Sequence, residues 1–430
     1  MCIVFTVITT ENVCHENTIN IEDIIISCLH GSLNDENYLS SVDMVFSANN
    51  FTSDLSKNQN ILLLLENNNI RTLKVLPNLS KITSLSFKHN VITEVENGAF
   101  QNIFHLKSLD LSYNELSGET LTKDIFTSNR VSENYEPLPL ENLNLGNNKI
   151  AFLKHDFFVH ISDLKSLDLS NNPIDILELK KAFVHLKKLQ VLNIAQSGLS
   201  FIPYSIFNSI PIQKLYINGN HFTHVPSSIS KLSKTLWFLN LNDNPIEEIN
   251  SDSFSQLSRL KELHIDGMNK LLMIDEDAFS PLAMLKILQC SFNPNLKFFH
   301  SKAFNKLKKR WTLEELYIHN NNLRYLSEDL AIWQKLNILD IRGNPWNCTC
   351  SLHWLFNFVK KRQMLNPEAN IGIRCSYPTQ LENSSFIDAD NLMQCKDEKQ
   401  NEKQESNRKR LKSSIISTIK YERARIHELD

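Results

Sequence analysis

One short phrase, L-x-x-L-x-L-x-x-N-x-L, recurs along most of this chain and limits the folds that it can adopt. The phrase is clearest at Leu164, Leu167, Leu169, Asn172 and Ile174. Two leucines separated by one polar residue have the period of a strand with one apolar face. Each phrase therefore predicts a short strand that ends in a turn at the asparagine. Its asparagine position falls at Asn49, Asn68, Asn90, Asn114, Asn148, Asn172, Ser197, Asn220, Asn244, Met268, Asn293, Asn321 and Asn344.

The spacing of these phrases predicts a stack of similar coils. Most steps are about 24 residues, a period typical of repeat proteins. No unit can bury its leucines alone, so neighbouring units must close one another's core. A buried asparagine can bond backbone groups of its own turn and of the adjacent coil. On the far side of the coils, the same pattern places Phe100, Phe158, Phe207, Phe254 and Phe279.

This pattern resembles the leucine-rich repeat family over about residues 41–395. The resemblance implies an α/β solenoid, a curved horseshoe with a parallel sheet on its concave face. The segment from Asn344 through Cys348 and Cys350, with Cys375 and Cys395, is similar to the C-terminal cysteine-rich cap of extracellular members, such as Toll-like receptor ectodomains and secreted immune or adhesion proteins. That family implies disulfides Cys348–Cys375 and Cys350–Cys395. A zinc site is the alternative for these cysteines, but their spacing and the secretory features disfavour it.

The rest of the chain divides around the repeats. We expect a leader at 1–13, an N-terminal cap at 14–40, repeats at 41–344, the C-terminal cap at 345–395 and a charged tail at 396–430. The leader has the apolar character of a secretory signal, with a disordered or strand-like segment as the alternative. A Cys14–Cys28 bridge would close the first cap. Cys290 takes a leucine position and is predicted to be a buried small hydrophobe.

Three segments depart from the period. Between Asn114 and Asn148 the step is longer, and the polar stretch 127–139 predicts a surface loop. A smaller insert at 308–311 lengthens the step before Asn321. The tail has the composition of a disordered or single-helical segment. A coiled coil that forms a homodimer or heterodimer is the sharper hypothesis for it.

Disulfides of this kind require an oxidising compartment, so we expect a secreted protein, or one held at the cell surface by a partner. Four N-x-S/T sequons agree with that location: Asn50, Asn78, Asn347 and Asn383. The formal charge of −3 and the pI of about 6.5 give no basic stripe for a phosphate-binding surface, so we do not expect nucleic acid as a ligand. No run of about 20 apolar residues is present to span a membrane.

The sequence contains no pattern that predicts catalysis. With nine glycines in the whole chain, a glycine-rich phosphate loop is absent, and so is a G-x-S-x-G elbow. His221 and His224 follow a turn without a carboxylate at metal-ligand spacing, so we interpret them as surface residues. We therefore expect no enzyme, no cofactor and no metal.

The candidate binding face consists of the strand residues beside the core leucines. Early units carry Ser, Asn and Asp there, whereas later units carry aromatic and charged residues, the composition of protein-binding hot spots. We predict that Tyr216, Phe238 and Tyr317 are exposed and that replacing them lowers affinity without lowering the melting temperature much. The full predicted set is Lys214, Tyr216, Phe238, Asn240, Glu262, His264, Glu315, Tyr317, His319, Asp340 and Arg342.

The favoured function is extracellular recognition of a protein or glycoconjugate through this face, as in innate immunity or cell-surface interaction. The alternative is a structural matrix or adhesion glycoprotein that holds partners along its length. An inhibitor that wraps a hydrolase is a third hypothesis.

Overall fold

The computed structural model describes residues 2–5, 23–28, 33–48, 60–79, 81–127, 137–365, 372–393 and 395. The chain divides into two compact units. The first contains residues 1–244 and 254–264, and the second contains residues 245–253 and 265–430.

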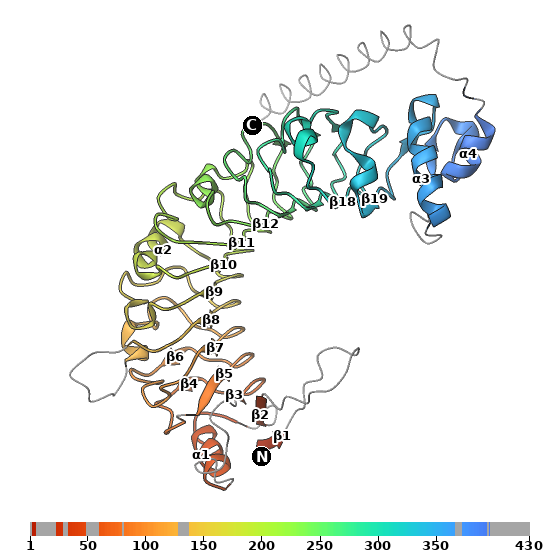
Figure 1. The fold of residues 1–430 in the computed structure, drawn as a ribbon. Helices are drawn as coiled ribbons and strands as arrows, with labels where there is room; N and C mark the ends of the chain where they lie inside the picture. Colours follow the sequence, from red (N-terminus) through yellow and green to blue (C-terminus); the bar gives the residue numbers. More distant parts are fainter. Residues whose placement is uncertain are drawn as a thin grey trace, which may run out of the picture. The chain divides into compact units, whose positions relative to one another are not determined.

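The first unit is built on a parallel sheet whose strands follow one another in chain order. Adjacent strands pair leucine to leucine, as in the register Leu167↔Leu192↔Leu215. Figure 1 shows β7 to β12 side by side, with helix α2 (Ile176–Ala182) on the opposite side of the coils. The strands of this sheet are β2 (Asp23–Cys28), β3 (Asn60–Leu64), β5 (Ile82–Ser86), β7 (Ser108–Asp110), β8 (Asn142–Asn144), β9 (Ser166–Asp168), β10 (Val191–Asn193), β11 (Lys214–Tyr216), β12 (Phe238–Asn240) and β14 (Glu262–His264).

Short elements line the return segments of the same unit. A small two-stranded sheet forms from β4 (Thr72–Leu73) and β6 (Glu94–Val95). The 3-10 helices are η1 (Lys123–Phe126), η2 (Val159–Ile161), η3 (Phe183–His185) and η4 (Ser227–Leu232). All five predicted core phenylalanines are buried. The structure adds rings that the pattern did not predict, since Phe126 lies between Phe100 and Phe157 with centroid distances of 5.7 and 5.6 Å.

The asparagines form the predicted ladder. Asn172 is 2% exposed, and its Nδ2 donates to Leu145 O at 2.9 Å and to Leu169 O at 3.0 Å. Its Oδ1 accepts the N–H of Ile150 from the preceding coil. At Ser197 the hydroxyl donates only to Ala195 O, and Ile174 N turns to Asn172 O instead. A hydroxyl therefore replaces only part of the amide's function.

A left-handed residue precedes each described ladder position, which the sequence analysis did not predict. Positive φ at this point turns the chain out of the strand, and Asn, Asp and Gly tolerate it best. Tyr113 and Phe292 hold the same conformation despite their bulk. The residues concerned are Asn67, His89, Tyr113, Asn147, Asn171, Gln196, Gly219, Asp243, Gly267, Phe292, Asn320 and Gly343.

The N-terminal end of the solenoid differs from the expected division at residue 40. Strand β2 pairs in parallel with β3, so the sheet already includes residues 23–28. Residues 41–48 belong to helix α1 (Tyr38–Ala48) rather than to a first repeat strand. Strand β1 (Cys2–Phe5), in the predicted leader, pairs antiparallel with β2 and places Cys2 opposite Cys28. Cys14, Asn49, Asn50, most of the 127–139 loop and the tail after Cys395 lie outside the described residues.

Tyr38 anchors α1 to the repeats. Its side chain is fully buried, meets Phe87 edge-on at 6.4 Å and accepts the N–H of Lys74 at 2.6 Å. Asp35 lies on the same coil and accepts the N–H groups of Arg71 and Thr72. At the open end of the described stack, no preceding repeat can accept hydrogen bonds from these backbone N–H groups. Tyr38 and Asp35 accept them instead.

Removing the Tyr38 hydroxyl should therefore destabilise this end. We expect Tyr38→Phe to lower the free energy of unfolding by about 1–3 kcal/mol, because the partly buried Lys74 N–H loses its acceptor. Urea denaturation followed by circular dichroism measures the change. Tyr204→Phe is the control, since Tyr204 is 56% exposed and should change stability by less than about 0.5 kcal/mol. Equal effects of the two substitutions would contradict the assigned role of Tyr38.

The second unit repeats the same coil. Its main strands are β16 (Ile287–Gln289), β18 (Glu315–Tyr317) and β19 (Ile338–Asp340), with Leu288, Leu316 and Leu339 in register. On the return segments, β13 (Glu248–Ile249), β15 (Met273–Ile274) and β17 (Phe298–Phe299) form a second parallel sheet. The 3-10 helices are η5 (Asn305–Arg310), η6 (Glu328–Leu330), η7 (Trp333–Lys335), η8 (Cys350–Leu352) and η9 (Thr379–Leu381).

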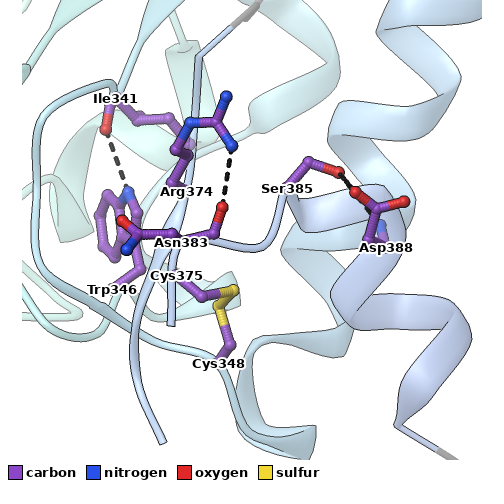
Figure 2. The surroundings of a disulfide bond; sticks show 8 residues. All are labelled: Ile341, Trp346, Cys348, Arg374, Cys375, Asn383, Ser385 and Asp388. Atoms are coloured by element: carbon purple, nitrogen blue, oxygen red, sulfur yellow. Dashed lines mark hydrogen bonds between the residues drawn. A yellow bond between two sulfur atoms is a disulfide. The ribbon is translucent and has the colours of Figure 1, made fainter. Parts of the chain in front are cut away.

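Two disulfides hold the C-terminal cap. Cys348 pairs with Cys375 and Cys350 pairs with Cys395, as the resemblance implies. In Figure 2, the first bridge lies beside Trp346, whose indole donates to Ile341 O at 3.1 Å. Trp346 is fully buried and belongs to β20 (Trp346–Asn347), which pairs with β21 (Cys375–Tyr377). The cap therefore closes the last coil with a ring, a short sheet and covalent links.

The helical spacing of Leu352, Trp354, Leu355 and Phe358 predicts one apolar face that covers the last coil, but the structure buries only the two leucines of this set. In η8 and α3 (His353–Leu365), Leu352, Leu355, Phe356 and Val359 are buried. The predicted Trp354 and Phe358 are half-buried and lie against the ring of Trp333 at 5.0 and 6.3 Å. On the other side, Phe356 packs on Phe386 of α4 (Phe386–Leu392), at 4.6 Å. The helix is therefore covered on two sides because α4, which the pattern did not reveal, packs against it.

Candidate functional site

The last residue of each strand has a structural task in many repeats. Its side-chain oxygen accepts the N–H two residues later and stabilises the turn. Asp110, Asn144, Asp168 and Asn193 all do this at 2.8–3.1 Å. Asn240 makes the same bond to Asn242 N, at 3.0 Å. Asn240, although predicted to bind a partner, therefore already serves its own turn.

Three strands of the candidate face replace this turn acceptor by a ring. Tyr216, His264 and Tyr317 occupy the position that Asn or Asp holds elsewhere. A tyrosine side chain has no acceptor atom near its backbone, so Tyr216 and Tyr317 cannot make this short turn bond. At all three positions the sheet surface gains a large side chain. A departure from a local rule without a structural benefit is expected mainly at functional positions.

In the first unit, Tyr216 and His264 form a continuous row of rings with Phe238, which lies between them. Tyr216 lies 4.8 Å from Phe238, and Phe238 lies 5.1 Å from His264, measured between ring centroids. Trp237 meets Phe238 edge-on at 6.2 Å. The Nζ of Lys214 lies 4.7 Å above the Trp237 ring. We name Lys214, Tyr216, Trp237, Phe238 and His264 the aromatic ladder.

The aromatic ladder is held rigid by its neighbours. Glu262 Oε1 lies 2.7 Å from His264 Nε2, and both side chains are partly buried. Burial and the nearby Glu262 charge raise the pKa of Tyr216. The tyrosine therefore remains a neutral hydrogen-bonding group at physiological pH. A surface with its rotamers already fixed loses little entropy when it binds.

The expected exposure of Phe238 is wrong. The sequence predicted an exposed ring, but the side chain is only 8% exposed because Tyr216, Trp237 and His264 surround it. Its role is to support the other rings, and its removal would leave a cavity beneath them. Trp237 is a further functional candidate that strand alternation does not reveal, because it lies one residue before β12.

The second unit carries a separate polar cluster. Tyr317 donates to Glu315 at 2.9 Å, and burial followed by this bond raises its pKa to about 12. Arg342 donates from Nε to Asp340 Oδ1 at 2.9 Å. Burial favours the neutral form of Asp340, but the bonds from Arg342 outweigh it and lower the pKa of this carboxyl. These residues are therefore largely paired with one another.

Phe292 adds an exposed ring to this cluster. It is 56% exposed, has a left-handed backbone and lies edge-on to His319 at 4.9 Å. Strand alternation does not reveal Phe292, because this residue lies in the turn and not in the strand. A strained exposed aromatic residue is a feature that functional surfaces often retain.

Ser291, His319 and Asp340 lie together but do not have the geometry of a catalytic triad. Ser291 Oγ and Asp340 Oδ2 both approach the same ring atom, His319 Nδ1, at 2.9 and 3.4 Å. A triad needs the serine and the carboxylate on different nitrogens of the imidazole. Ser291 is also 2% exposed, which keeps its hydroxyl from a substrate.

Among the described residues, no group of three or more His, Cys, Asp or Glu could hold a metal ion. The helices in the described ranges include none that is long and apolar enough to cross a membrane. Of the sequons, Asn78, Asn347 and Asn383 all lie at exposed positions. Cys290 is fully buried and unpaired, and burial raises the pKa of its thiol.

The repeats match two family models described as leucine rich repeat, one at residues 139–199 and 210–271 and the other at residues 105–124. Together with the stacked coils and the disulfide-bonded cap, these matches define the chain as a leucine-rich repeat protein of the extracellular type.

Its curated relatives include Tsukushi from Gallus gallus, with 31% identity over 62% of this chain and 62% of the relative. Osteomodulin from Bos taurus is 29% identical over 47% of this chain and 50% of its own length. Toll-like receptor 9 from Mus musculus is 28% identical over 80% of this chain and 33% of the receptor. The chain thus spans less than two thirds of the length of these relatives.

Solved structures show the same fold. The TLR13-ssRNA13 complex has a TM-score of 0.53 at 24% identity and covers 76% of this chain and 52% of that one. The mouse RP105/MD-1 complex also has a TM-score of 0.53, at 23% identity, and covers 79% of this chain and 51% of that one. At these identities the likeness concerns the fold alone.

Proposed function

We propose that this chain is an extracellular recognition protein that binds a protein partner through the aromatic ladder of its first unit. The observation that carries the proposal is the presence of rings at Tyr216 and His264, in register with Asn240 on the strand between them. Their rings lie in one row with Phe238, at centroid distances of 4.8 and 5.1 Å. Tyrosine and tryptophan supply large contact area at low entropic cost, which is typical of binding hot spots.

The charges beside the rings support a protein rather than an apolar ligand. Lys214 lies over Trp237, and Glu262 pairs with His264, so opposite charges flank the rings. Such a mixture fits a partner surface that also combines aromatic and charged groups. The second unit carries its own candidates for contact with a partner, namely Tyr317, His319 and Phe292. A glycoconjugate is the other ligand class that rings and paired charges could hold.

The test compares matched substitutions in partner capture from extracellular fluid. We expect Lys214→Ala/Tyr216→Ala to weaken binding by about tenfold or more, because it removes a half-buried ring and its neighbouring cation. The melting temperature should fall only slightly, since Phe238 is retained. Surface plasmon resonance with the captured partner measures the affinity. Treating the fluid with protease or with glycosidase before capture distinguishes a protein from a glycan.

The control is Tyr204→Ala/Lys231→Ala. Lys231 lies 4.3 Å above the Tyr204 ring, so this pair is also a cation over a tyrosine, but it is on return segments instead of strands. Unchanged affinity is expected for the control. If the control pair abolishes binding while the Lys214/Tyr216 pair does not, the aromatic ladder is not the binding surface.

A further inference from the structure

The second unit has a strongly basic surface on its return segments. From Ser291 to Leu313 the chain has no aspartate or glutamate, and its basic residues are concentrated near η5. We name this cluster the basic surface, and it consists of the exposed Lys302, Lys306, Lys309 and Arg310 together with the half-buried Lys308. The whole chain has a formal charge of −3, so this concentration of positive charge is local.

Apolar anchors fix the direction of these side chains. Leu307 within η5 is 4% exposed, and Trp311 directly after it is 8% exposed. The Trp311 indole donates to Leu313 O at 2.9 Å and packs edge-on against Phe304 at 5.6 Å. Between these two inward residues, Lys309 and Arg310 are exposed and Lys308 is half-buried. A 3-10 helix repeats every three residues, so Lys306 and Lys309 share one side of η5.

Only part of the positive charge is neutralised. Lys302 pairs with Glu276 at 3.1 Å, and Lys306 pairs with Asp277 at 3.5 Å. Within the described part of the chain, Lys308, Lys309 and Arg310 have no carboxylate within 4.0 Å. Three adjacent cations thus remain for an external anion.

We propose that the basic surface binds a sulfated polysaccharide. A chain of sulfates matches a row of cations without requiring a deep pocket, and lysine and arginine bind such groups through charge-assisted hydrogen bonds. The nearest rings, Phe304 and Trp311, are buried, so bases of a nucleic acid would find no stacking platform beside the charges. The cap disulfides also require an oxidising compartment, and sulfated polysaccharides occur outside the cell.

The test uses the intact glycoprotein and immobilised heparin. We expect retention at about 0.15 M salt, and a fall in affinity as salt rises, because bound counterions are displaced when cations meet a polyanion. Lys308→Gln/Lys309→Gln/Arg310→Gln should weaken heparin binding by about tenfold or more. Lys107→Gln/Lys187→Gln/Lys234→Gln removes the same formal charge from exposed lysines of the first unit and should change affinity less than about twofold.

Circular dichroism confirms that both triple variants remain folded. Loss of binding in the first variant alone, with weak binding of N-desulfated heparin, supports the proposal. Three outcomes overturn it: equal losses in both variants, equal binding of desulfated heparin, or tighter binding of a length-matched single-stranded RNA than of heparin. The basic surface and the aromatic ladder lie in different units. The Lys308/Lys309/Arg310 variant should therefore lose heparin binding and still capture the protein partner, so the two proposals can fail independently.

Discussion

Asn172→Leu is expected to destabilise the protein by about 3–5 kcal/mol, one of the two largest effects that we predict. The side chain is 2% exposed and links two coils through Ile150 N and Leu145 O. Leucine has a similar volume but no polar atoms, so it leaves these backbone groups buried without partners. Urea denaturation followed by circular dichroism measures the loss of free energy.

Ser197→Ala is the matched control at the same ladder position. Ser197 Oγ donates only to Ala195 O, so its loss should cost about 1 kcal/mol. A much smaller effect for Asn172→Leu than for Ser197→Ala would mean that leucine packing, and not the amide ladder, specifies the turns.

Cys348→Ser/Cys375→Ser is expected to lower the stability of the C-terminal cap by roughly 3–4 kcal/mol. The bridge spans 27 residues, and removing it restores the conformational freedom of that loop in the unfolded state. The same change leaves two buried hydroxyls where the sulfurs lay, since both cysteines are almost fully buried. Hydrogen exchange should become faster across β20, β21 and α4, which surround the bridge.

Cys290→Ala provides the control for thiol chemistry. Cys290 is unpaired and fully buried, so a reductant should destabilise the Cys290→Ala variant as much as the natural chain. Unchanged exchange in the cap of the Cys348/Cys375 variant would show that apolar packing around Trp346 is sufficient to hold it.

The repeat period predicted the fold well because it reflects a physical necessity. A coil that cannot bury its own leucines must stack, and the stack requires polar partners at each turn. The ladder asparagines, the strand leucines and five core phenylalanines followed from this argument. The pairing of the cap cysteines followed from the family resemblance. Neither the resemblance nor the repeat pattern predicted helix α4, so the burial of α3 on two sides was not predicted.

The N-terminal end was less predictable because its elements have no period. Residues 38–48 form a helix whose apolar side is set by Tyr38 and Val42, and no second copy of this helix exists in the sequence for comparison. Strand β2, rich in isoleucine, lacks the leucine spacing of the later strands. The left-handed turn residues were visible as a recurrent Asn, Asp or Gly, but Tyr113 and Phe292 at the same point concealed the rule.

The strand positions of several candidate residues were predicted, but the surroundings of their side chains were not. Alternation correctly placed Lys214, Tyr216 and His264 on the strands. It could not show that Phe238 lies beneath its neighbours, because burial depends on the rings of adjacent strands. It also treated Asn240 as free to bind, although the structure uses that side chain for the turn.

Hydroxyl-radical footprinting of the protein with its captured partner tests the central claim most directly. The experiment reads the oxidation of Tyr216, Trp237 and Tyr204 in a single sample, with Tyr204 as the internal reference. The account predicts that the partner protects Tyr216 and Trp237 while Tyr204 is oxidised as in the free protein. Protection of Tyr204 together with unchanged oxidation of Tyr216 and Trp237 would contradict it.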